Sequence, residues 1–383
     1  MLFRSNDGHS KIKILFVIHD LSVGGAEKVL INLVNNMDYL KFDVTVLALF
    51  DEGVNKQFLN SKIKYRYAFR HAIRGNSHYM KLLSPKQLYR WLVSDEYDIV
   101  ISYLEGPSAR IVAGCPKNKT KIVSWIHCTY HNKEELAKSF RDIKEAYKCY
   151  EKSDRMIFVS EEVKQAFIRY CPIKCETHVL YNTNESEKII VKAAERIEED
   201  LFKKNTFFWC GVGKIVPNKG FDRMIRIQRR LLEEGYDVQL LILGTGWQQK
   251  ELENLCEENG VSNAVTFLGY QTNPYKYVSN CDLFVCASYA EGFSTATTEA
   301  LIVGTPVCTV NVSGMKEMLG ENDEFGVIVE NNEEALYSGI KKLMDNPELL
   351  KHYKNMSIQR GKAFSTAETV NAVQNMLIRL MEE

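Results

Sequence analysis

Short apolar runs recur along the first half of the chain, separated by segments whose apolar residues follow a helical spacing. The runs lie at residues 11–18, 42–49, 97–103, 121–127 and 156–160. Continuous apolar strands are typical of parallel sheets that are covered by helices on both faces. The pattern therefore predicts a parallel sheet, with a first helix at residues 26–36 after a glycine-rich turn.

The second half repeats this alternation. Predicted strands lie at residues 206–212, 238–243, 264–268, 282–287, 306–312 and 326–329, and predicted helices at 220–234, 247–259 and 293–303. Alternating strands and helices indicate a doubly wound α/β domain. The charged stretch 182–205 has no strong strand pattern and separates the halves. We expect two Rossmann-like domains, 1–184 and 185–364, with a last helix at about 365–383 that crosses back to the first.

Composition narrows the class of protein. Lys+Arg and Asp+Glu both number 49 in 383 residues, which argues against a general nucleic-acid binder. The ten cysteines show neither disulfide nor zinc spacing and suit buried thiols in a reducing compartment. The chain shows no signal-peptide pattern and no apolar run long enough to span a bilayer. We expect a cytoplasmic protein, with any membrane contact at the inner face of the cell membrane.

The segment from Glu291 to Glu299 carries the clearest candidate chemistry. It follows the predicted strand 282–287, and we expect a helix from about Phe293 that places Glu299 about two turns in. The first-turn N–H groups, at Ser294 and Thr295, suit a diphosphate. Glu291 could accept hydrogen bonds from sugar hydroxyls and Glu299 from ribose hydroxyls. Two solvated carboxylates would give the same spacing, so the Gly-Phe pair and the preceding strand support the functional interpretation.

A second candidate segment runs from Gly211 to Gly220. Lys214 and Lys219 follow a predicted strand and precede a helix, so both could reach phosphate oxygens while the glycines allow close backbone approach. The segment matches neither the dinucleotide glycine fingerprint nor a P-loop. Taken alone, it could equally be a solvated loop with two lysines.

Taken in order, these motifs resemble glycosyltransferase family 4, a group of retaining enzymes with the GT-B fold. The resemblance is strongest over Phe208–Gly326, in the segments Val-Gly-Lys-Ile-Val-Pro-Asn-Lys-Gly, Leu-Ile-Leu-Gly-Thr-Gly, Val-Thr-Phe-Leu-Gly-Tyr, Glu-Gly-Phe-Ser and Glu-Ala-Leu-Ile-Val-Gly-Thr-Pro-Val. It implies two Rossmann-like domains that face each other across a cleft. The family usually has Arg where Lys214 stands, which loses a bidentate fork but keeps the charge. It usually has an acidic residue where Thr245 stands.

The resemblance implies roles for individual residues. Glu291, His127 and Lys219 are the expected catalytic residues. The expected donor-binding residues are Gly25, Lys214, Lys219, Glu291, Gly292, Phe293, Ser294, Thr295 and Glu299. Departure and attack on one face of the sugar, through a short-lived ion pair, would retain the anomeric configuration. Lys214, Lys219 and the helix N-terminus would stabilise the leaving diphosphate, so we expect no metal and no cofactor beyond the nucleotide-sugar substrate.

Two features of the first half fit the same interpretation. Gly24, Gly25 and Glu27 follow the first strand, and the similar family segment lines the cleft near the transferred sugar. An ordinary strand-to-helix turn with a first-turn carboxylate is the alternative. His127 ends the strand 121–127, where α/β folds place ligand residues. The resemblance suggests that it touches the sugar, and the alternative is a structural histidine.

Residues 61–90 are basic and aromatic, without a single Asp or Glu. Arg66, Arg70 and Arg74 lie among tyrosines and could meet an anionic lipid surface or the diphosphate of a polyprenyl-linked acceptor. With Gly24 they are the expected acceptor or membrane side. A solvated basic face is the alternative, and the nearby Asp95, Glu96 and Asp98 could neutralise part of it.

Three functions stay open on this evidence. The first is transfer of a hexose or N-acetylhexosamine from a nucleotide-sugar, more often a UDP-sugar than GDP-mannose in the family, to a saccharide or lipid-linked acceptor. The second is a nucleotide-sugar epimerase of the same fold, and the third is a non-catalytic partner subunit. The basic aromatic stretch favours a transferase over an epimerase. The joint presence of Glu291, Glu299, Lys219 and His127 argues against a silent subunit.

Overall fold

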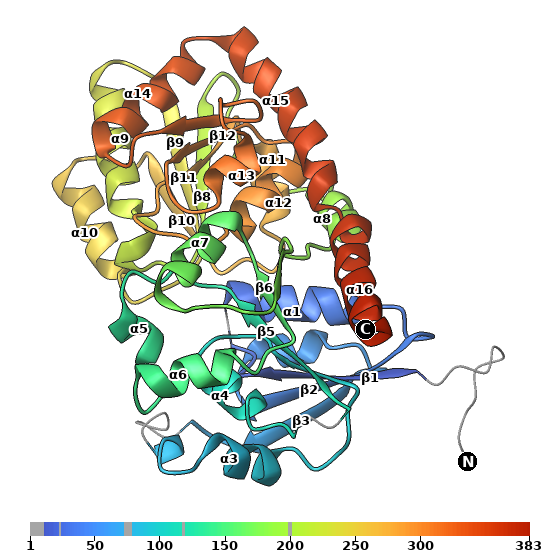
Figure 1. The fold of residues 1–383 in the computed structure, drawn as a ribbon. Helices are drawn as coiled ribbons and strands as arrows, with labels where there is room; N and C mark the ends of the chain where they lie inside the picture. Colours follow the sequence, from blue (N-terminus) through green and yellow to red (C-terminus); the bar gives the residue numbers. More distant parts are fainter. Residues whose placement is uncertain (1–10, 23, 73–78, 117–118, 198–200) are drawn as a thin grey trace. The chain divides into compact units, whose positions relative to one another are not determined.

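The structure is a computed structural model that describes residues 11–22, 24–72, 79–116, 119–197 and 201–383. It divides into two compact units (Figure 1). The first contains the chain up to Thr183 together with Ala367–Glu383, and the second contains Asn184–Thr366.

The first unit is built on a seven-stranded parallel sheet in the order β3-β2-β1-β4-β5-β6-β7. Its strands are β1 (Ile12–Ile18), β2 (Phe42–Phe50), β3 (Lys64–Phe69), β4 (Ile99–Ser102), β5 (Lys121–Ile126), β6 (Arg155–Phe158) and β7 (Glu176–Val179). Its helices are α1 (Gly25–Asn36), α3 (Pro85–Leu92), α4 (Pro107–Val112), α5 (Lys133–Ala137), α6 (Ile143–Tyr150), α7 (Glu161–Tyr170) and, from Ala367 on, α16 (Thr366–Glu382), besides the 3-10 turn Val54–Phe58. In Figure 1, α1 and α3 lie on opposite faces of this sheet.

The second unit repeats the design with six parallel strands in the order β10-β9-β8-β11-β12-β13. The strands are β8 (Phe207–Val212), β9 (Val238–Leu243), β10 (Val265–Gly269), β11 (Leu283–Cys286), β12 (Val307–Val310) and β13 (Val327–Val329). The helices are α8 (Ser186–Ala193), α9 (Phe221–Glu233), α10 (Gln249–Glu258), α11 (Tyr275–Asn280), α12 (Thr295–Val303), α13 (Met315–Leu319), α14 (Glu333–Met344) and α15 (Pro347–Gly361), with 3-10 turns at Pro217–Lys219 and Lys362–Phe364. The predicted fold class, two Rossmann-like parallel-sheet units, is confirmed.

Two strands and one helix start differ from the sequence prediction. The edge strands β3 and β7 lack a continuous apolar run, because most of their side chains reach solvent. β3 lies inside the stretch that we interpreted only as a basic aromatic surface. Helix α12 begins at Thr295 and not at Phe293, because Ser294 is its N-cap and accepts a hydrogen bond from the Thr297 N–H at 3.3 Å.

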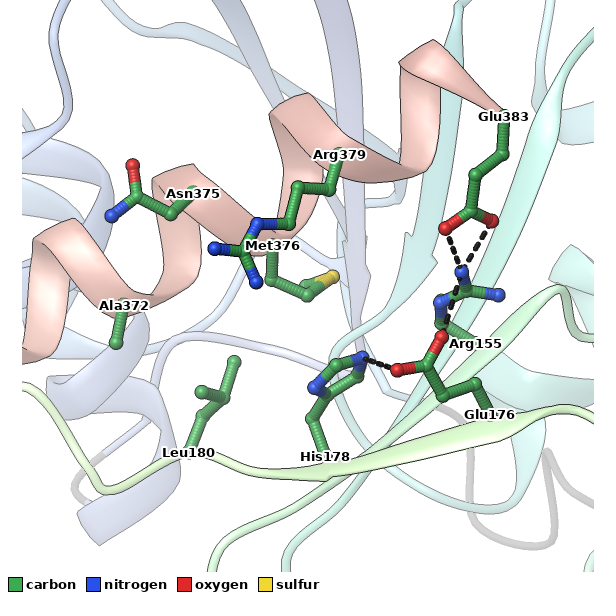
Figure 2. A pocket seen from close by; sticks show the side chains of 9 residues that line it. All are labelled: Arg155, Glu176, His178, Leu180, Ala372, Asn375, Met376, Arg379 and Glu383. Atoms are coloured by element: carbon green, nitrogen blue, oxygen red, sulfur yellow. Dashed lines mark hydrogen bonds and ion pairs between the residues drawn. The ribbon is translucent and has the colours of Figure 1, made fainter.

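Helix α16 is fixed to the first unit by polar contacts. The Asp38 N–H donates to the Gln374 side chain at 2.6 Å. Arg155 on β6 bridges Glu176 on β7, at 2.9 Å, and Glu383 (Figure 2). A cavity of about 270 Å³ beside this bridge is lined by Arg155, Glu176, His178, Leu180, Ala372, Asn375, Met376, Arg379 and Glu383. Its charges largely compensate one another, so we interpret it as the seam between the sheet edge and α16.

Candidate active site

The strand order of the second unit reverses between β8 and β11. In open α/β sheets, ligands bind at the carboxyl ends of the strands beside such a reversal. Lys214 and Lys219 follow β8, and Glu291 follows β11. The sheet therefore brings together two motifs that lie more than 70 residues apart, since Lys219 and Glu291 are separated by 72 positions.

Glu291 is held by one of its two carboxylate oxygens. Lys219 Nζ lies 2.5 Å from Oε1, and Ser288 Oγ donates to the same oxygen at 2.7 Å. Within the described residues, no hydrogen bond to Oε2 accompanies these two contacts. The side chain of Glu291 is 11% exposed and that of Lys219 is 27% exposed. Lys219 and Ser288 thus orient Glu291 through Oε1, and Oε2 is the oxygen available to a ligand hydroxyl.

A small cavity lies beside Lys219 and Glu291. Its volume is about 10 Å³, the space of roughly one water molecule. It is lined by Val212, Lys219, Phe221, Met224, Phe284, Val285, Cys286, Ala287, Ser288, Glu291 and Ser294. Lys219, Glu291 and Ser294 of this lining belong to the predicted donor site, and Ser288 is hydrogen-bonded to Glu291. A cavity of this size cannot admit a sugar ring.

Glycine at position 220 makes the Lys219–Glu291 contact possible. Gly220 has φ +68°, and a Cβ there would lie 2.0 Å from the carbonyl oxygen of Ala287, at the end of β11. Only glycine combines this conformation with such a close approach. The backbone after Lys219 therefore touches the strand that leads to Glu291. The same reasoning explains Gly244, with φ +138°, whose Cβ would lie 1.8 Å from the Gly213 carbonyl oxygen.

The remaining donor-site residues lie around helix α12. Glu299 is buried inside the helix face and accepts a hydrogen bond from Tyr275 Oη at 3.3 Å. Ser294 and Phe293 are also buried, and Phe293 packs edge-on against Phe364. Gly292 precedes them, and Thr295 opens the helix with its N–H groups uncommitted to helical bonding. Because α12 starts two residues later than predicted, Glu299 lies about one turn, not two, from its start.

Lys214 differs from Lys219 in that it forms no ion pair with Glu291. Its side chain is exposed, and the described part of the chain offers it no ion pair. The structure therefore joins Lys219 to Glu291 but leaves Lys214 at the surface of the same loop. Sequence reasoning missed Ser288 and Tyr275, which orient the two glutamates; a serine three positions before Glu291, directly after a strand, was the available signal for the first.

In the first unit, the turn after β1 carries a carboxylate over a glycine. Helix α1 begins at Gly25, and a Cβ at Gly24 would lie 2.0 Å from Glu27 Oε2. Any larger residue at position 24 would displace this carboxylate. Gly24 thus leaves room for the Glu27 carboxylate at the start of α1.

His127 is buried, with 8% of its surface exposed, at the carboxyl end of β5. Burial lowers its pKa to about 3, although a hydrogen bond with the backbone of Tyr103 acts in the opposite direction. Nε2 has no partner among the described residues, so Nδ1 is the nitrogen that faces the Tyr103 carbonyl. A neutral ring with the proton on Nδ1 leaves a lone pair on Nε2. His127 therefore offers a hydrogen-bond acceptor.

Glu105 supports His127 and was missed by the sequence analysis. Its Oε1 accepts hydrogen bonds from the backbone N–H of His127 at 2.7 Å and of Cys128 at 2.5 Å. Burial raises the pKa of Glu105, and these N–H groups partly offset the shift. A glutamate that follows the strand 97–103, beside the reversal between β1 and β4, was the available signal.

His127 gives the protein a testable pH dependence of stability. Because its pKa is lowered from 6.5 to about 3, the unfolded chain binds a proton that the folded chain does not between these values. Stability should therefore fall as the pH is lowered below 6.5, by up to about 1.4 kcal/mol per pH unit from this residue. Urea unfolding across this range measures it. The His127→Gln variant should lose this part of the slope; an unchanged slope would contradict the neutral, buried ring.

The predicted acceptor or membrane residues are partly neutralised. Arg66 lies 2.6 Å from Asp95 and donates to Ser94 Oγ at 3.1 Å, and Lys64 lies 2.6 Å from Asp43. Arg70 is exposed, and Arg74 lies outside the described residues. Asp95 thus neutralises part of the basic stretch, as its sequence position suggested, and Asp43 on β2 adds a second acidic partner beside β3.

The described residues contain neither a candidate metal-ligand cluster nor a candidate membrane-spanning helix. No group of three or more His, Cys, Asp or Glu side chains is arranged to hold a metal ion there. No helix in this part of the chain combines the length and apolar character needed to cross a bilayer. The ten cysteines are free thiols. Eight of them are buried, Cys175 is half-buried and Cys128 is exposed.

Fold and site together define a glycosyltransferase of the GT-B class. The family model described as glycosyltransferase family 4 matches residues 23–184, and the model described as glycosyl transferases group 1 matches residues 193–360. The chain belongs to glycosyltransferase family 4.

Individual relatives support this assignment. The chain is 32% identical over 366 residues to the N-acetylgalactosamine-N,N'-diacetylbacillosaminyl-diphospho-undecaprenol 4-alpha-N-acetylgalactosaminyltransferase of Campylobacter jejuni, covering 92% of this chain and 95% of that protein. It is 23% identical to the lipopolysaccharide core biosynthesis glycosyltransferase LpsD of Rhizobium meliloti, covering 87% and 88%. The crystal structure of Anabaena HepE with UDP and glucose superimposes with a TM-score of 0.78 at 19% identity, covering 96% of this chain and 99% of that one.

Proposed function

We propose that this glycosyltransferase moves a hexose or N-acetylhexosamine from a UDP-sugar to a saccharide on a lipid-linked acceptor, with retention of configuration and without a metal ion. The observation that carries the proposal is the Glu291–Lys219 pair beside the N-terminus of α12. It combines an oriented carboxylate with a cation and free N–H groups at the strand reversal of the second unit.

The second unit would bind the donor. Lys219, Lys214 and the first turn of α12 supply positive charge for the diphosphate, both in the bound donor and as charge grows on the leaving group. Glu291 Oε2 would accept a hydrogen bond from a sugar hydroxyl, while Ser288 fixes the opposite oxygen. Glu299, oriented by Tyr275, would accept from the ribose. Because this cationic set can stabilise the leaving group, the scheme needs no metal.

The first unit would meet the transferred sugar and the acceptor. The lone pair on His127 Nε2 suits a sugar hydroxyl as its hydrogen-bond donor. No residue of the site is assigned as a covalent nucleophile, so we propose attack on the face from which the diphosphate departs. The leaving phosphate oxygen would then accept the proton of the acceptor hydroxyl.

The proposed classes of donor and acceptor are inferred from the molecules that are named for two relatives of this chain. HepE was solved with UDP, and the name of the Campylobacter relative specifies an undecaprenyl diphosphate acceptor that carries saccharides. An acceptor of this kind lies in a membrane, so the proposal includes peripheral contact with the inner face of the cell membrane and a role in surface-glycan assembly.

A donor screen tests the proposal. Thermal unfolding is measured with UDP-glucose, UDP-galactose, UDP-N-acetylglucosamine, UDP-N-acetylgalactosamine and GDP-mannose, each with and without EDTA, alongside slow release of free nucleotide. We expect one UDP-sugar to raise Tm, EDTA to leave this unchanged, and NMR of the product to show the anomeric configuration of the donor. Stabilisation by GDP-mannose alone, dependence on a metal, or an inverted product would each contradict the corresponding part.

A further inference from the structure

The segment that precedes α3 exposes apolar side chains on a fixed backbone. Leu82 is 77% exposed and Tyr79 is 64% exposed. Four successive carbonyl groups of this segment accept hydrogen bonds from two arginines. Arg110 donates to the carbonyls of Met80 and Leu83, at 2.6 Å each, and Arg141 donates to those of Lys81, at 2.6 Å, and Leu82, at 3.0 Å.

The two arginines are themselves held in place by Glu145. Arg110 is buried, with 1% of its side chain exposed, and forms two hydrogen bonds with Glu145, at 3.0 Å and 2.9 Å. The Arg141 N–H donates to the same carboxylate at 2.7 Å. Lys81 adds a bond to the Lys138 carbonyl at 2.7 Å. Since hydrogen bonds with charged groups are among the stronger ones, the backbone of residues 80–83 is rigidly supported.

This support distinguishes Leu82 from an ordinary exposed leucine. Single apolar side chains on a surface are common and need no explanation. Leu40, for example, is 76% exposed in the turn between α1 and β2, where its N–H donates to Asp38 and no arginine among the described residues binds its carbonyl. At Leu82, by contrast, a buried arginine and an ion pair fix a backbone whose apolar side chain stays in water.

The charged residues within the segment itself have one sign. Residues 79–92 contain Lys81, Lys86 and Arg90 and no acidic residue. Lys86 and Arg90 are exposed and lie four positions apart on α3, hence on one face, while Leu88 and Tyr89 are buried. Trp91 is 62% exposed at the end of the helix. A basic segment with exposed leucine, tyrosine and tryptophan suits the interface of an anionic bilayer.

We infer that residues 79–91 form a membrane-contact surface, in which Leu82 and Tyr79 enter the interfacial layer of an anionic bilayer and Lys86 and Arg90 meet its headgroups. The inference rests on the proposed function, because a lipid-linked acceptor would lie in that bilayer. A bilayer fits better than a protein partner, since a specific protein interface buries about 1,200–2,000 Å² and is depleted of lysine, whereas this short segment is rich in exposed basic residues. The rigid support holds the apolar side chains ready before contact.

Vesicle sedimentation tests the inference with the full chain. The probes are vesicles of phosphatidylcholine alone and of an equal mixture of phosphatidylcholine and phosphatidylglycerol. We expect the protein to sediment with the mixed vesicles, and Leu82→Glu to weaken this binding at least about tenfold. Leu40→Glu is the matched control, with the same substitution at equal exposure, and should bind like the unchanged protein. Lys86→Gln should weaken binding about fivefold.

A second pair of variants tests the support rather than the apolar contact. Arg141→Met removes the donors to the Lys81 and Leu82 carbonyls but keeps Leu82 itself. We expect weaker vesicle binding than for Lys144→Met, which removes the same charge from the exposed face of α6 without touching the segment. Equal binding of these two variants would overturn the role of the rigid backbone.

Other outcomes overturn the membrane inference as a whole. These are equal binding of Leu82→Glu and the unchanged protein, absence of preference for phosphatidylglycerol, or loss of self-association in Leu82→Glu with vesicle binding intact. Because Leu82 is exposed, the variant should keep its Tm and its stabilisation by the UDP-sugar. Donor stabilisation without vesicle binding would thus refute this inference alone, and vesicle binding without any donor response would refute the proposed transfer alone.

Discussion

Glu291→Gln is expected to lower kcat for sugar transfer by about 100- to 1000-fold, the usual effect of removing one oriented electrostatic contact from an active site. The amide keeps the size of the carboxylate but loses the charge that pairs with Lys219 at 2.5 Å. With the amide oxygen in the place of Oε1 beside Lys219, the amide NH2 group stands where Oε2 was. It then donates a hydrogen bond where the carboxylate accepted one. Steady-state kinetics with the donor identified by the screen measure the loss.

Glu233→Gln provides the matched control for this variant. Glu233 pairs with Arg229 at 2.7 Å in the last turn of α9, so the same change removes an ion pair of the same unit outside the candidate site. We expect unchanged kcat and a Tm within experimental error. Equal kcat for Glu291→Gln and Glu233→Gln would refute the assignment of Glu291, and equal Tm values would show that the loss at Glu291 is not a folding defect.

Arg110→Met is expected to lower the free energy of unfolding by about 3–5 kcal/mol, because it breaks a buried ion pair from one side. The variant leaves Glu145, with 15% of its side chain exposed, without its bidentate partner. It also leaves the carbonyls of Met80 and Leu83 without donors. Urea denaturation at neutral pH measures the loss.

Glu145 adds a pH signature to this prediction. Burial alone would raise the pKa of Glu145, but the hydrogen bonds from Arg110 and Arg141 outweigh it and leave the pKa lowered. The stabilisation is therefore present above the usual glutamate pKa and lost as the pH falls through the lowered value. The difference between the unchanged protein and Arg110→Met should shrink in acid. Arg229→Met, at an exposed pair, should cost less than about 1 kcal/mol; a similar loss in both variants would contradict the buried role of Arg110.

The apolar runs determined most of the fold. Every buried strand from β1 to β13 was predicted within a few residues, because a parallel strand that is covered on both faces needs a continuous apolar run. The glycines of the segment 211–220 were also predicted to allow close backbone approach, whereas the role of Gly244 emerged only in the structure. Gly220 and Gly244 adopt positive φ at contacts where a Cβ would overlap a carbonyl oxygen, and no other residue type meets both requirements. The ordered motifs around Lys219, Glu291 and Glu299 then identified the family.

The contacts that orient these residues were decided only by tertiary structure. The partners of Glu291 and of His127 are set by strand order, which joins residues that are 72 and 22 positions apart. The carbonyls before α3 are bound by Arg110 and Arg141, which lie 27 to 60 positions away along the chain. The local sequence does not indicate such pairs, because the two partners come into contact only once the tertiary structure has formed. Edge strand β3 escaped prediction for a related reason: it is held by hydrogen bonds with β2, and none of its side chains is fully buried, so it has no continuous apolar run.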